Sequence, residues 1–556
     1  MTLTTDALLA GSPRFNDAAL AKIELQQGAA AAWRKALQRS PPEAAAAAQG
    51  HFAVGLRDDA GHTFLAVDRF AAHTICYRDD GQTLHYAARA DALAKDTNDI
   101  DLQAVFDYLY FHAVPSPRTV FRGVQRLPAG HFAWNANGHT EVGRYWTPSF
   151  REEPMSFAAA RDQFRSLLAQ AVAAQVDTAR PAAFLSGGTD SSTIAGMIGQ
   201  VTGRAAATYS IGFEAQGYDE MAYARLASRH FGTQHHEHYI SAADLVRLIP
   251  EVAQHHDQPF GNSSALPTYF CAMKAREDGV TRLLAGDGGD ELFGGNTRYA
   301  KQRVFSLYDA VPSVLRKSLF EPVADGGRLD RIPLLGKAAS YVRQARVPMP
   351  DRLQTYNLLH RLGQTQVLTP GFLAQIDANG PAAQQRAVWA ESTGASFVNR
   401  MLAYDWRYTL AENDLPKVRS STELAGVEVE YPFLDQAVLE FSTRLPTHFK
   451  LKGLKLRWFF KEALRGFLPD AILRKEKHGF GLPFGVWATR DPALKALARD
   501  SVRGLGTRGI VRQQFTDVLV DQHLQAHPGY YGEMVWILMM LEQWFRHHAP
   551  NYRLPT

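Results

Sequence analysis

The stretch "FLSGGTDSST" at residues 184–193 follows the apolar run "PAAF" at residues 181–184 and surrounds one aspartate with glycines and hydroxyl side chains. A Gly-Gly pair lets backbone N–H groups converge on one point, and the neighbouring hydroxyls add further donors. Such an arrangement suits an anion. A glycine-rich turn after a strand is also a common plain turn, so this stretch needs a second signal.

Strand-like and helix-like segments alternate around this turn. "AAFLS" is strand-like, "STIAGMIGQV" helix-like, "AAATYSIGF" strand-like and "DEMAYARLASRHF" helix-like. This alternation predicts an α/β fold with a doubly wound parallel sheet, in which phosphates bind where a strand ends and the next helix begins. The chain has no GxxxxGK[S/T] loop, so we expect a loop that holds the α-phosphate and the departing pyrophosphate.

A second glycine-rich stretch carries acids. "LLAGDGGDELFGGNTRY" at residues 283–299 follows another apolar strand and contains Asp287, Asp290 and Glu291. Asp190 and Asp290 are expected to meet at neighbouring strand ends. Two carboxylates that face a triphosphate favour a hard cation between them, which predicts Mg²⁺.

Together, SGGxDS and GDGGDELFGG resemble the asparagine synthetase family, whose synthetase half is an ATP pyrophosphatase that adenylates a carboxylate. The likeness continues through "YSIGF", "HDQPFGNSSALPTYF", "GVEVEYPFLD" and "RKEKHGFGLPFGVW" and covers roughly residues 50 to 546. It implies a β-rich N-terminal-nucleophile-hydrolase-like domain, then the doubly wound synthetase domain with a helical C-terminal part.

The resemblance implies ATP and Mg²⁺ as cofactors and assigns residues to them. The residues expected to cradle the pyrophosphate are Ser186, Gly187, Gly188, Asp190 and Ser191. Those expected to line the adenosine pocket are Leu185, Ser210 and Gly286, and those expected to hold Mg²⁺ are Asp190 and Asp290.

Two catalytic residues are also carried over from the family. Glu428 in "GVEVEYPFLD" matches an acid beside the reacting centre, and Lys477 in "RKEKHGFG" matches a lysine that neutralises transition-state charge. Attack on an acyl-adenylate develops negative charge at oxygen while the amine loses a proton, so a cation and a carboxylate address both needs. The alternatives are that Glu428 has only a structural role and that Lys477 is a solvated surface residue.

The chain divides into two regions with different sequence patterns. From His51 onward, "HFAVGLRD", "HTFLAVDRF", "TICYRDD" and "TLHYAARA" predict antiparallel sheet, and the chain from about residue 300 is mostly helical in pattern. We place the boundary near residues 146–155. This gives a degenerate, inactive glutaminase-like domain at 1–150 and a synthetase domain at 151–556.

Departures from the family concern the nitrogen source. Glutamine-using members begin Met-Cys-Gly, whereas this chain begins Met-Thr-Leu, and Cys76 and Cys271 are expected in the core. We therefore expect a truncated glutaminase half without its nucleophile. Arg419, Ser420 and Asn262 replace residues common in asparagine synthetases, so we expect an acceptor other than free aspartate.

These observations predict an ATP-dependent, AMP-forming synthetase that lets a substrate amine attack an adenylated carboxylate. Cyclisation of a lasso-type peptide to a macrolactam is the favoured instance. An ammonia-dependent asparagine synthetase, an amidotransferase of a biosynthetic pathway and a nucleotide-binding pseudoenzyme scaffold are the alternatives.

The composition of the chain limits the kinds of binding partner that we expect. The formal net charge is only +4 over 556 residues, which gives a nucleic-acid partner no support. No apolar run approaches the ~20 residues that span a bilayer, no leader is recognised, and two cysteines suit the cytoplasm. The expected partners are a small-molecule or peptide substrate with a carboxylate and an amine, and a precursor peptide with its processing protease.

Overall fold

The fold is described from a computed structural model, which describes residues 7–215, 217–309, 311–322, 333–476 and 481–554. Its central feature is a five-stranded parallel sheet with the strand order β13-β12-β11-β14-β15. The strands are β11 (Ala182–Phe184), β12 (Ala207–Phe213), β13 (Gln234–Ile240), β14 (Arg282–Leu284) and β15 (Glu428–Glu430). The chain builds outward from β11 and then returns to add β14 on its other side. The predicted doubly wound sheet is confirmed.

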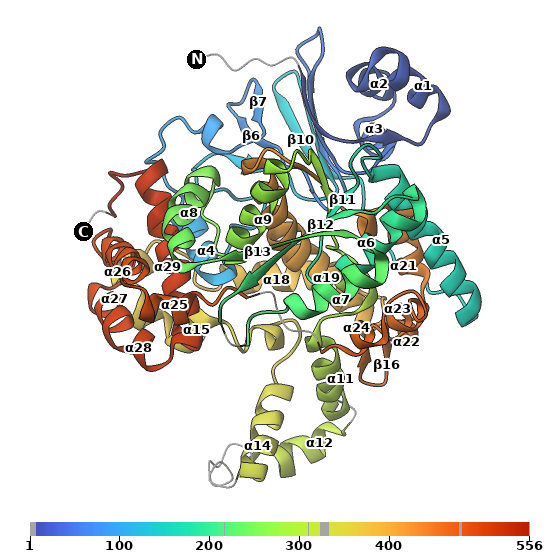
Figure 1. Cartoon of the computed structure of the whole chain (residues 1–556). Coiled ribbons are helices and arrows are strands. Elements are labelled where there is room, and N and C mark those ends of the chain that lie inside the picture. Colours follow the sequence, from blue (N-terminus) through green and yellow to red (C-terminus); the bar gives the residue numbers. More distant parts are fainter. Residues whose placement is uncertain (1–6, 216, 310, 323–332, 477–480, 555–556) are drawn as a thin grey trace.

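Helices cover both faces of this sheet (Figure 1). They are α5 (Phe157–Gln175), α6 (Thr189–Thr202), α7 (Met221–Phe231), α8 (Ala242–His255) and α9 (Ala265–Glu277). Consecutive strand residues point to opposite layers: Leu283 packs in the core that contains α8 and α9, and Leu284 in the core that contains α5, α6 and α7. Burial on both faces explains the apolar character of the inner strands β11, β12 and β14, whereas the edge strands β13 and β15 carry polar residues.

The N-terminal region forms an antiparallel sheet with the order β1-β4-β5-β9-β10, as predicted from its short β-rich runs. The strands are β1 (Ala7–Gly11), β4 (Phe52–Arg57), β5 (Thr63–Val67), β9 (His131–Ala136) and β10 (His139–Arg144). A smaller sheet joins β6 (Cys76–Asp79), β7 (Leu84–Ala87) and β8 (Gln125–Arg126). Helices α1 (Ala18–Gln27), α2 (Ala29–Ala36), α3 (Pro41–Ala46) and α4 (Leu102–Phe111) complete this region.

The chain beyond β14 is mainly helical, as expected. Its longer helices are α18 (Gly380–Glu391), α19 (Phe397–Asp405), α20 (Leu415–Leu424), α21 (Gln436–Arg444), α26 (Pro492–Gly506) and α29 (Pro528–His548). A π-helical segment, η5 (Trp406–Asp414), joins α19 to α20. Helices α11 (Thr297–Asp309) and α14 (Pro333–Ala345) project from the body (Figure 1).

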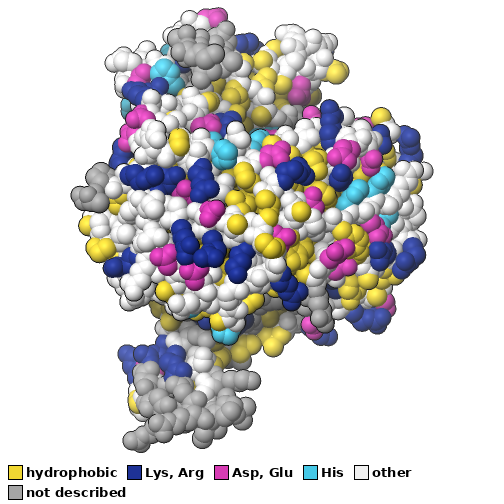
Figure 2. All heavy atoms as spheres, turned by 60° about the vertical axis from the view of Figure 1, so that its left-hand side comes forward, with side chains coloured by type: hydrophobic (Ala, Val, Ile, Leu, Met, Phe, Trp, Pro, Cys, Tyr) yellow, Lys and Arg dark blue, Asp and Glu magenta, His cyan; other side chains and the backbone are white. Residues whose placement is uncertain are grey.

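The charge on the surface and the apolar character of the long helices indicate which kinds of binding partner the protein can have. On the face shown in Figure 2, basic and acidic side chains are interspersed over the main body. The apolar run "VWILMML" lies inside α29, where its residues belong to the buried core. Across the residues that the structure describes, none of the helices combines the length and the apolar character needed to cross a membrane.

A buried ion pair joins the N-terminal region to the parallel sheet. His51 Nδ1 lies 2.9 Å from Glu430 Oε2, and both side chains are under 9% exposed, at 2% and 8%. Burial alone would lower the pKa of His51, but the hydrogen bond and charge of Glu430 outweigh it and raise that pKa above its ordinary value of 6.5. Desolvation opposes ionisation of Glu430 as well, yet His51 holds its pKa below 4.5.

This pair predicts a pH-dependent stability. Because the pKa of His51 is raised in the folded protein, its contribution to the free energy of unfolding is complete below pH 6.5 and is lost as the pH rises through the folded pKa. Because the pKa of Glu430 is lowered, its contribution to the free energy of unfolding is complete above pH 4.5. Breaking one partner of a buried pair costs ~3–5 kcal/mol. We therefore expect His51→Gln to lower the thermal midpoint more at pH 6 than at pH 9.

The matched control is His62→Gln, because His62 pairs with Asp58 at 2.9 Å on the surface. Its thermal midpoint should stay close to wild type at both pH values. An equal loss at pH 6 and pH 9 for His51→Gln would show that the pair carries no charge-dependent stability.

Candidate active site

The turn after β11 leads directly into α6. Gly187 has φ +71°, and a Cβ there would lie 2.4 Å from the backbone nitrogen of Ala224, so only glycine fits. Gly188 caps α6 without any side-chain hydrogen bond to the first backbone N–H groups. These groups and the helix dipole form an anion site at the start of the helix.

Two serines shape this turn from inside. The backbone N–H of Ser186 donates to Ser191 Oγ at 3.1 Å, and the two hydroxyl oxygens lie 3.0 Å apart. The Ser210 hydroxyl, on β12, donates to the Leu185 carbonyl. Ser186 therefore lies just past the end of β11, Ser191 lies in the first turn of α6, and Ser210 lies within the neighbouring strand β12.

The turn after β14 touches the turn after β11. A Cβ on Gly286 would lie 2.8 Å from the backbone nitrogen of Ser191. Gly288 has φ +98° and caps the short helix α10 (Gly289–Phe293), which carries Asp290 in its first turn. The second glycine-rich stretch thus brings its acids to the loop that starts α6.

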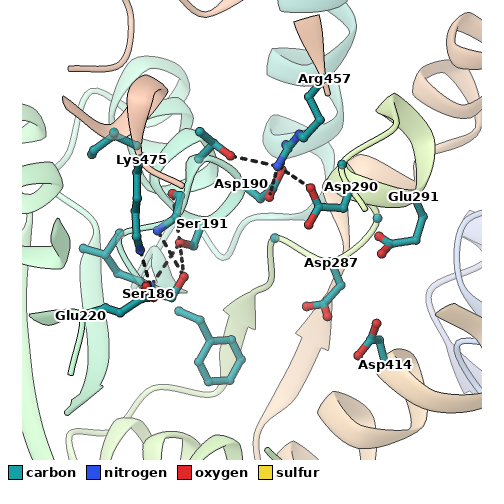
Figure 3. A pocket seen from close by; sticks show the side chains of 18 of the residues that line it. Ser186, Asp190, Ser191, Glu220, Asp287, Asp290, Glu291, Asp414, Arg457 and Lys475 are labelled. Atoms are coloured by element: carbon teal, nitrogen blue, oxygen red, sulfur yellow. Dashed lines mark hydrogen bonds and ion pairs between the residues drawn. The ribbon is translucent and has the colours of Figure 1, made fainter. Parts of the chain in front are cut away.

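Asp190 and Asp290 meet, as the sequence predicted, and Arg457 lies between them (Figure 3). Arg457 Nη1 donates to Asp190 Oδ2 at 2.8 Å and to Asp290 Oδ1 at 2.5 Å. Burial of Arg457 opposes its charge, but the two carboxylates outweigh this and raise the pKa of the guanidinium. A Cβ on Gly289 or Gly295 would overlap these carboxylates, so glycines make the room they occupy.

A cavity of about 970 Å³ lies over both turns at the carboxyl ends of the strands. The predicted residues that line it are Leu185, Ser186, Gly188, Asp190, Ser191, Ser210, Gly286 and Asp290. Gly187 shapes the turn from behind. The cavity lies where the strand order reverses between β11 and β14, which is where doubly wound sheets bind ligands.

One wall of the cavity carries a lysine between two acids. Lys417 Nζ, on α20, lies 3.0 Å from Asp414 Oδ1 and 3.7 Å from Asp287 Oδ1. Burial raises the pKa of Asp287, although Lys417 opposes this. For Lys417, burial lowers the pKa, and the two carboxylates raise it by more. Sequence reasoning noted Asp287 in its motif but gave no role to Asp414 or Lys417, although Lys417 lies two residues before Arg419, a noted departure from the family.

The opposite wall carries a second lysine. Lys475 Nζ lies 2.9 Å from Glu220 Oε2, and its side chain is buried. Figure 3 shows Lys475 and Glu220 beside Ser186, across the cavity from Asp287 and Asp414. The sequence motif around it had pointed to Lys477, which lies outside the described residues.

Glu428 does not reach the cavity. It is the first residue of β15, pairs with Arg282 at 2.7 Å, and its side chain is 69% exposed. The strand is parallel to β14, whose carboxyl end opens into the cavity, so an acid at the amino end lies at the opposite edge of the sheet. The sequence-based placement of Glu428 beside the reacting centre is therefore corrected. Asp287 and Asp414 are among the acids that do line the cavity.

The two cysteines lie in the core, as expected. Cys76 and Cys271 are both buried, and burial raises the pKa of both thiols. Over the described part of the chain, neither thiol is therefore suited to be a nucleophile.

Two family models match this chain. Residues 163–546 match the family model described as "Asparagine synthase", and residues 34–146 match "Glutamine amidotransferase domain". Asparagine synthetase (glutamine-hydrolysing) 1 of Bacillus subtilis is 24% identical over 90% of this chain and 78% of its own length. A Mycobacterium bovis protein with the provisional name of a glutamine-hydrolysing asparagine synthetase is 30% identical over 80% of this chain and 67% of its own length.

A more distant relative has a different name. Amidase chry2 of Gibberella zeae is 21% identical over 66% of this chain and 60% of its own length. The "Asparagine synthase" match spans well over half of the chain and includes both glycine-rich turns and the lysine-bearing walls of the cavity. The chain belongs to the asparagine synthetase family and is an ATP-dependent carbon–nitrogen ligase.

Proposed function

We propose that the protein adenylates a substrate carboxylate with ATP, releases pyrophosphate, and lets a substrate amine attack the acyl-adenylate to form an amide. The observation that carries this proposal is the meeting of the two glycine-rich turns at one cavity, where an anion site adjoins two converging carboxylates. Closure of a peptide to a macrolactam, as in lasso-type peptides, is the favoured instance, with a precursor peptide and its protease as partners.

Mg²⁺ fits the residues present. Asp190 and Asp290 converge on one cation already, the Arg457 guanidinium, which shows that their oxygens can share positive charge. They would hold Mg²⁺ together with phosphate oxygens, since Mg²⁺ binds through one or two carboxylates plus substrate phosphates. When bound, the ion would offset the phosphate charge that builds up as pyrophosphate departs.

In the first step, a carboxylate oxygen attacks the α-phosphorus of ATP, and the bond to the pyrophosphate oxygen breaks. The open N–H groups at the start of α6 face the phosphates in this arrangement. Arg457 and Lys475 line the same cavity and supply positive charge near them. The products of this step are the acyl-adenylate and pyrophosphate.

In the second step, the amine forms a C–N bond to the acyl carbon, AMP departs, and the nitrogen loses a proton. Asp287 is the proposed proton acceptor, because its raised pKa makes it a better base than an ordinary aspartate. Lys417, beside it, would stabilise the negative charge that develops on the acyl oxygen. These two residues take the roles that the sequence had given to Glu428 and Lys477.

The kind of acceptor that the enzyme uses is inferred from the residues that line the cavity. Asn262, one of the residues that depart from the asparagine synthetase pattern, lines the cavity. Arg419 instead pairs with Glu423 at 2.9 Å along α20 and does not line the cavity. The replacement at Asn262 supports an acceptor other than free aspartate. The relatives named asparagine synthetase favour ammonia-dependent asparagine formation as the second candidate.

Adenylation is tested by exchange of labelled pyrophosphate into ATP, with aspartate and synthetic peptides as carboxylate donors. Asp190→Asn and Asp290→Asn should each lower this exchange at least ~10²-fold, since each removes one preorganised charge from the phosphate site. Asp351→Asn is the matched control, because Asp351 pairs with Arg386 at 2.7 Å away from the cavity. Exchange at the wild-type rate in the cavity variants would refute the assignment.

Amide formation is tested separately. Asp287→Asn should slow product formation by ~10²-fold or more while carboxylate-dependent exchange persists, because the amide is a poor base of nearly the same shape. In the wild type, this step should also slow as the pH falls through the raised pKa of Asp287. Single-turnover assays would measure both effects.

Glu428→Gln provides the control for this experiment, since it makes the equivalent change at the exposed end of β15. We expect its product formation to stay within twofold of wild type. If Glu428→Gln slows amide formation and Asp287→Asn does not, the assignment from the sequence motif is right and the one proposed from the structure is wrong.

A further inference from the structure

A second cavity, of about 600 Å³, adjoins the first. Its walls come from the end of α4 and the segment after it, from η5, from the short helix α15 (Leu358–Leu362) and the segment before it, and from the start of α29. None of the residues proposed for adenylation line this cavity. Its purpose is therefore not explained by nucleotide binding.

The partition between the two cavities is thin. Asp414 lines both of them. Beside it, Asn262 of the first cavity donates from Nδ2 to Oδ1 of Asn413, a residue of the second cavity, at 2.5 Å. Asp414 and this pair of amides thus lie where the linings of the two cavities meet. A molecule that occupied the second cavity would have one end beside this partition.

Aromatic rings form much of the second cavity. Phe111 and Tyr408 stack with centroids 5.3 Å apart and an interplanar angle of 8°, and Tyr404 lies 4.9 Å from Tyr408. Arg361 lies over Tyr530, 5.2 Å from the ring centroid. Such rings favour another flat ring or a cationic nitrogen, through stacking and cation–π attraction.

One polar atom in this wall lacks a partner. The hydroxyl of Tyr408 is buried and has no hydrogen bond to any residue that the structure describes. Burial raises the pKa of Tyr408, so the phenol stays protonated and keeps its donor. Because this oxygen is closed off from solvent, the contribution of Tyr408 to the wall of the cavity comes from its ring.

We propose that the second cavity binds the body of the amine substrate, a primary amine attached to an aromatic group, and that the amine passes Asp414 to reach the acyl-adenylate. This inference rests on the proposed function and names the class of nucleophile. Asp414 attracts the cationic amine at the partition. The cationic amine first loses one proton to a carboxylate of the wall, because only the neutral amine has a lone pair. Its attack forms the C–N bond, the C–O bond to AMP breaks, and the second proton leaves the nitrogen for Asp287. Free ammonia would leave this cavity without a role.

Binding of phenethylamine, a simple probe of this class, tests the proposal. Calorimetry and saturation-transfer NMR should detect binding to the wild type in the presence of saturating ATP. Tyr408→Leu should weaken binding about tenfold, and Tyr408→Phe should weaken it less, because it keeps the ring. 3-Phenylpropanoate, which carries a carboxylate in place of the amine, should not compete.

Tyr552→Leu is the matched control, because Tyr552 stacks on Phe545 at 5.3 Å and 6°, nearly the geometry of the Phe111–Tyr408 pair, but outside both cavities. It should bind phenethylamine as the wild type does. Unchanged ATP affinity and thermal midpoint in Tyr408→Leu would exclude a folding defect. Asp414→Asn should weaken the binding of phenethylamine, because it removes the negative charge that attracts the cationic amine.

Three results would overturn the inference: phenethylamine binding that Tyr408→Leu leaves unchanged, displacement of phenethylamine by ATP, or no binding of the probe to an enzyme that is active in pyrophosphate exchange. The exchange assay needs no amine, so it judges adenylation by itself. Loss of exchange in the wild type would reject the proposed function, whereas normal exchange without amine binding would reject only the second cavity as the acceptor site.

Discussion

The close approach of two backbone turns is the constraint on which the site depends. A Cβ on Gly286 would lie 2.8 Å from the nitrogen of Ser191, and one on Gly289 would lie 2.0 Å from Asp190 Oδ1. Because β11 and β14 are neighbours in the sheet, their turns leave from the same edge and must share this space. The glycines let both turns occupy it. Their contact brings Asp190 and Asp290 to one point, from which the cavity opens.

Local patterns were enough to predict much of the fold. Alternating apolar strands and amphipathic helices around residue 190, and the short β-rich runs after His51, correspond to the parallel and antiparallel sheets. The turn residues were predicted for the same reason, since a glycine with φ above +60° at Gly187 or Gly288 is a strictly local requirement. The extent of the N-terminal domain and its boundary near residue 150 stay predictions.

The side chains that complete the site could not be found in this way. Arg457 is a single cation in the turn before α23, and Lys417 is one in α20; only the tertiary fold brings them to Asp190, Asp290 and Asp287. Glu428 shows the converse error. The motif around it was matched correctly to the family, but the direction of β15 decides which of its residues faces the cavity, and Glu428 pairs with the first residue of β14, far from the turn. Strand direction and register are non-local quantities.

Ion pairs connect the segments that form the walls of the cavity. Asp190 and Asp290 pair with Arg457, Asp287 and Asp414 with Lys417, and Glu220 with Lys475. The acids and their cations belong mostly to different segments of the chain, so the walls of the cavity are held together by the same charges that are proposed to meet the substrates. Under the proposed function, a triphosphate in this cavity would compete with the carboxylates for Arg457 and Lys475, and it would thereby make the carboxylates available to a metal ion. Because Lys417 and its acids lie on the other wall, this exchange of partners leaves the proposed amide-forming residues in place. Adenylation and amide formation can therefore take place in one cavity while they depend on different ion pairs.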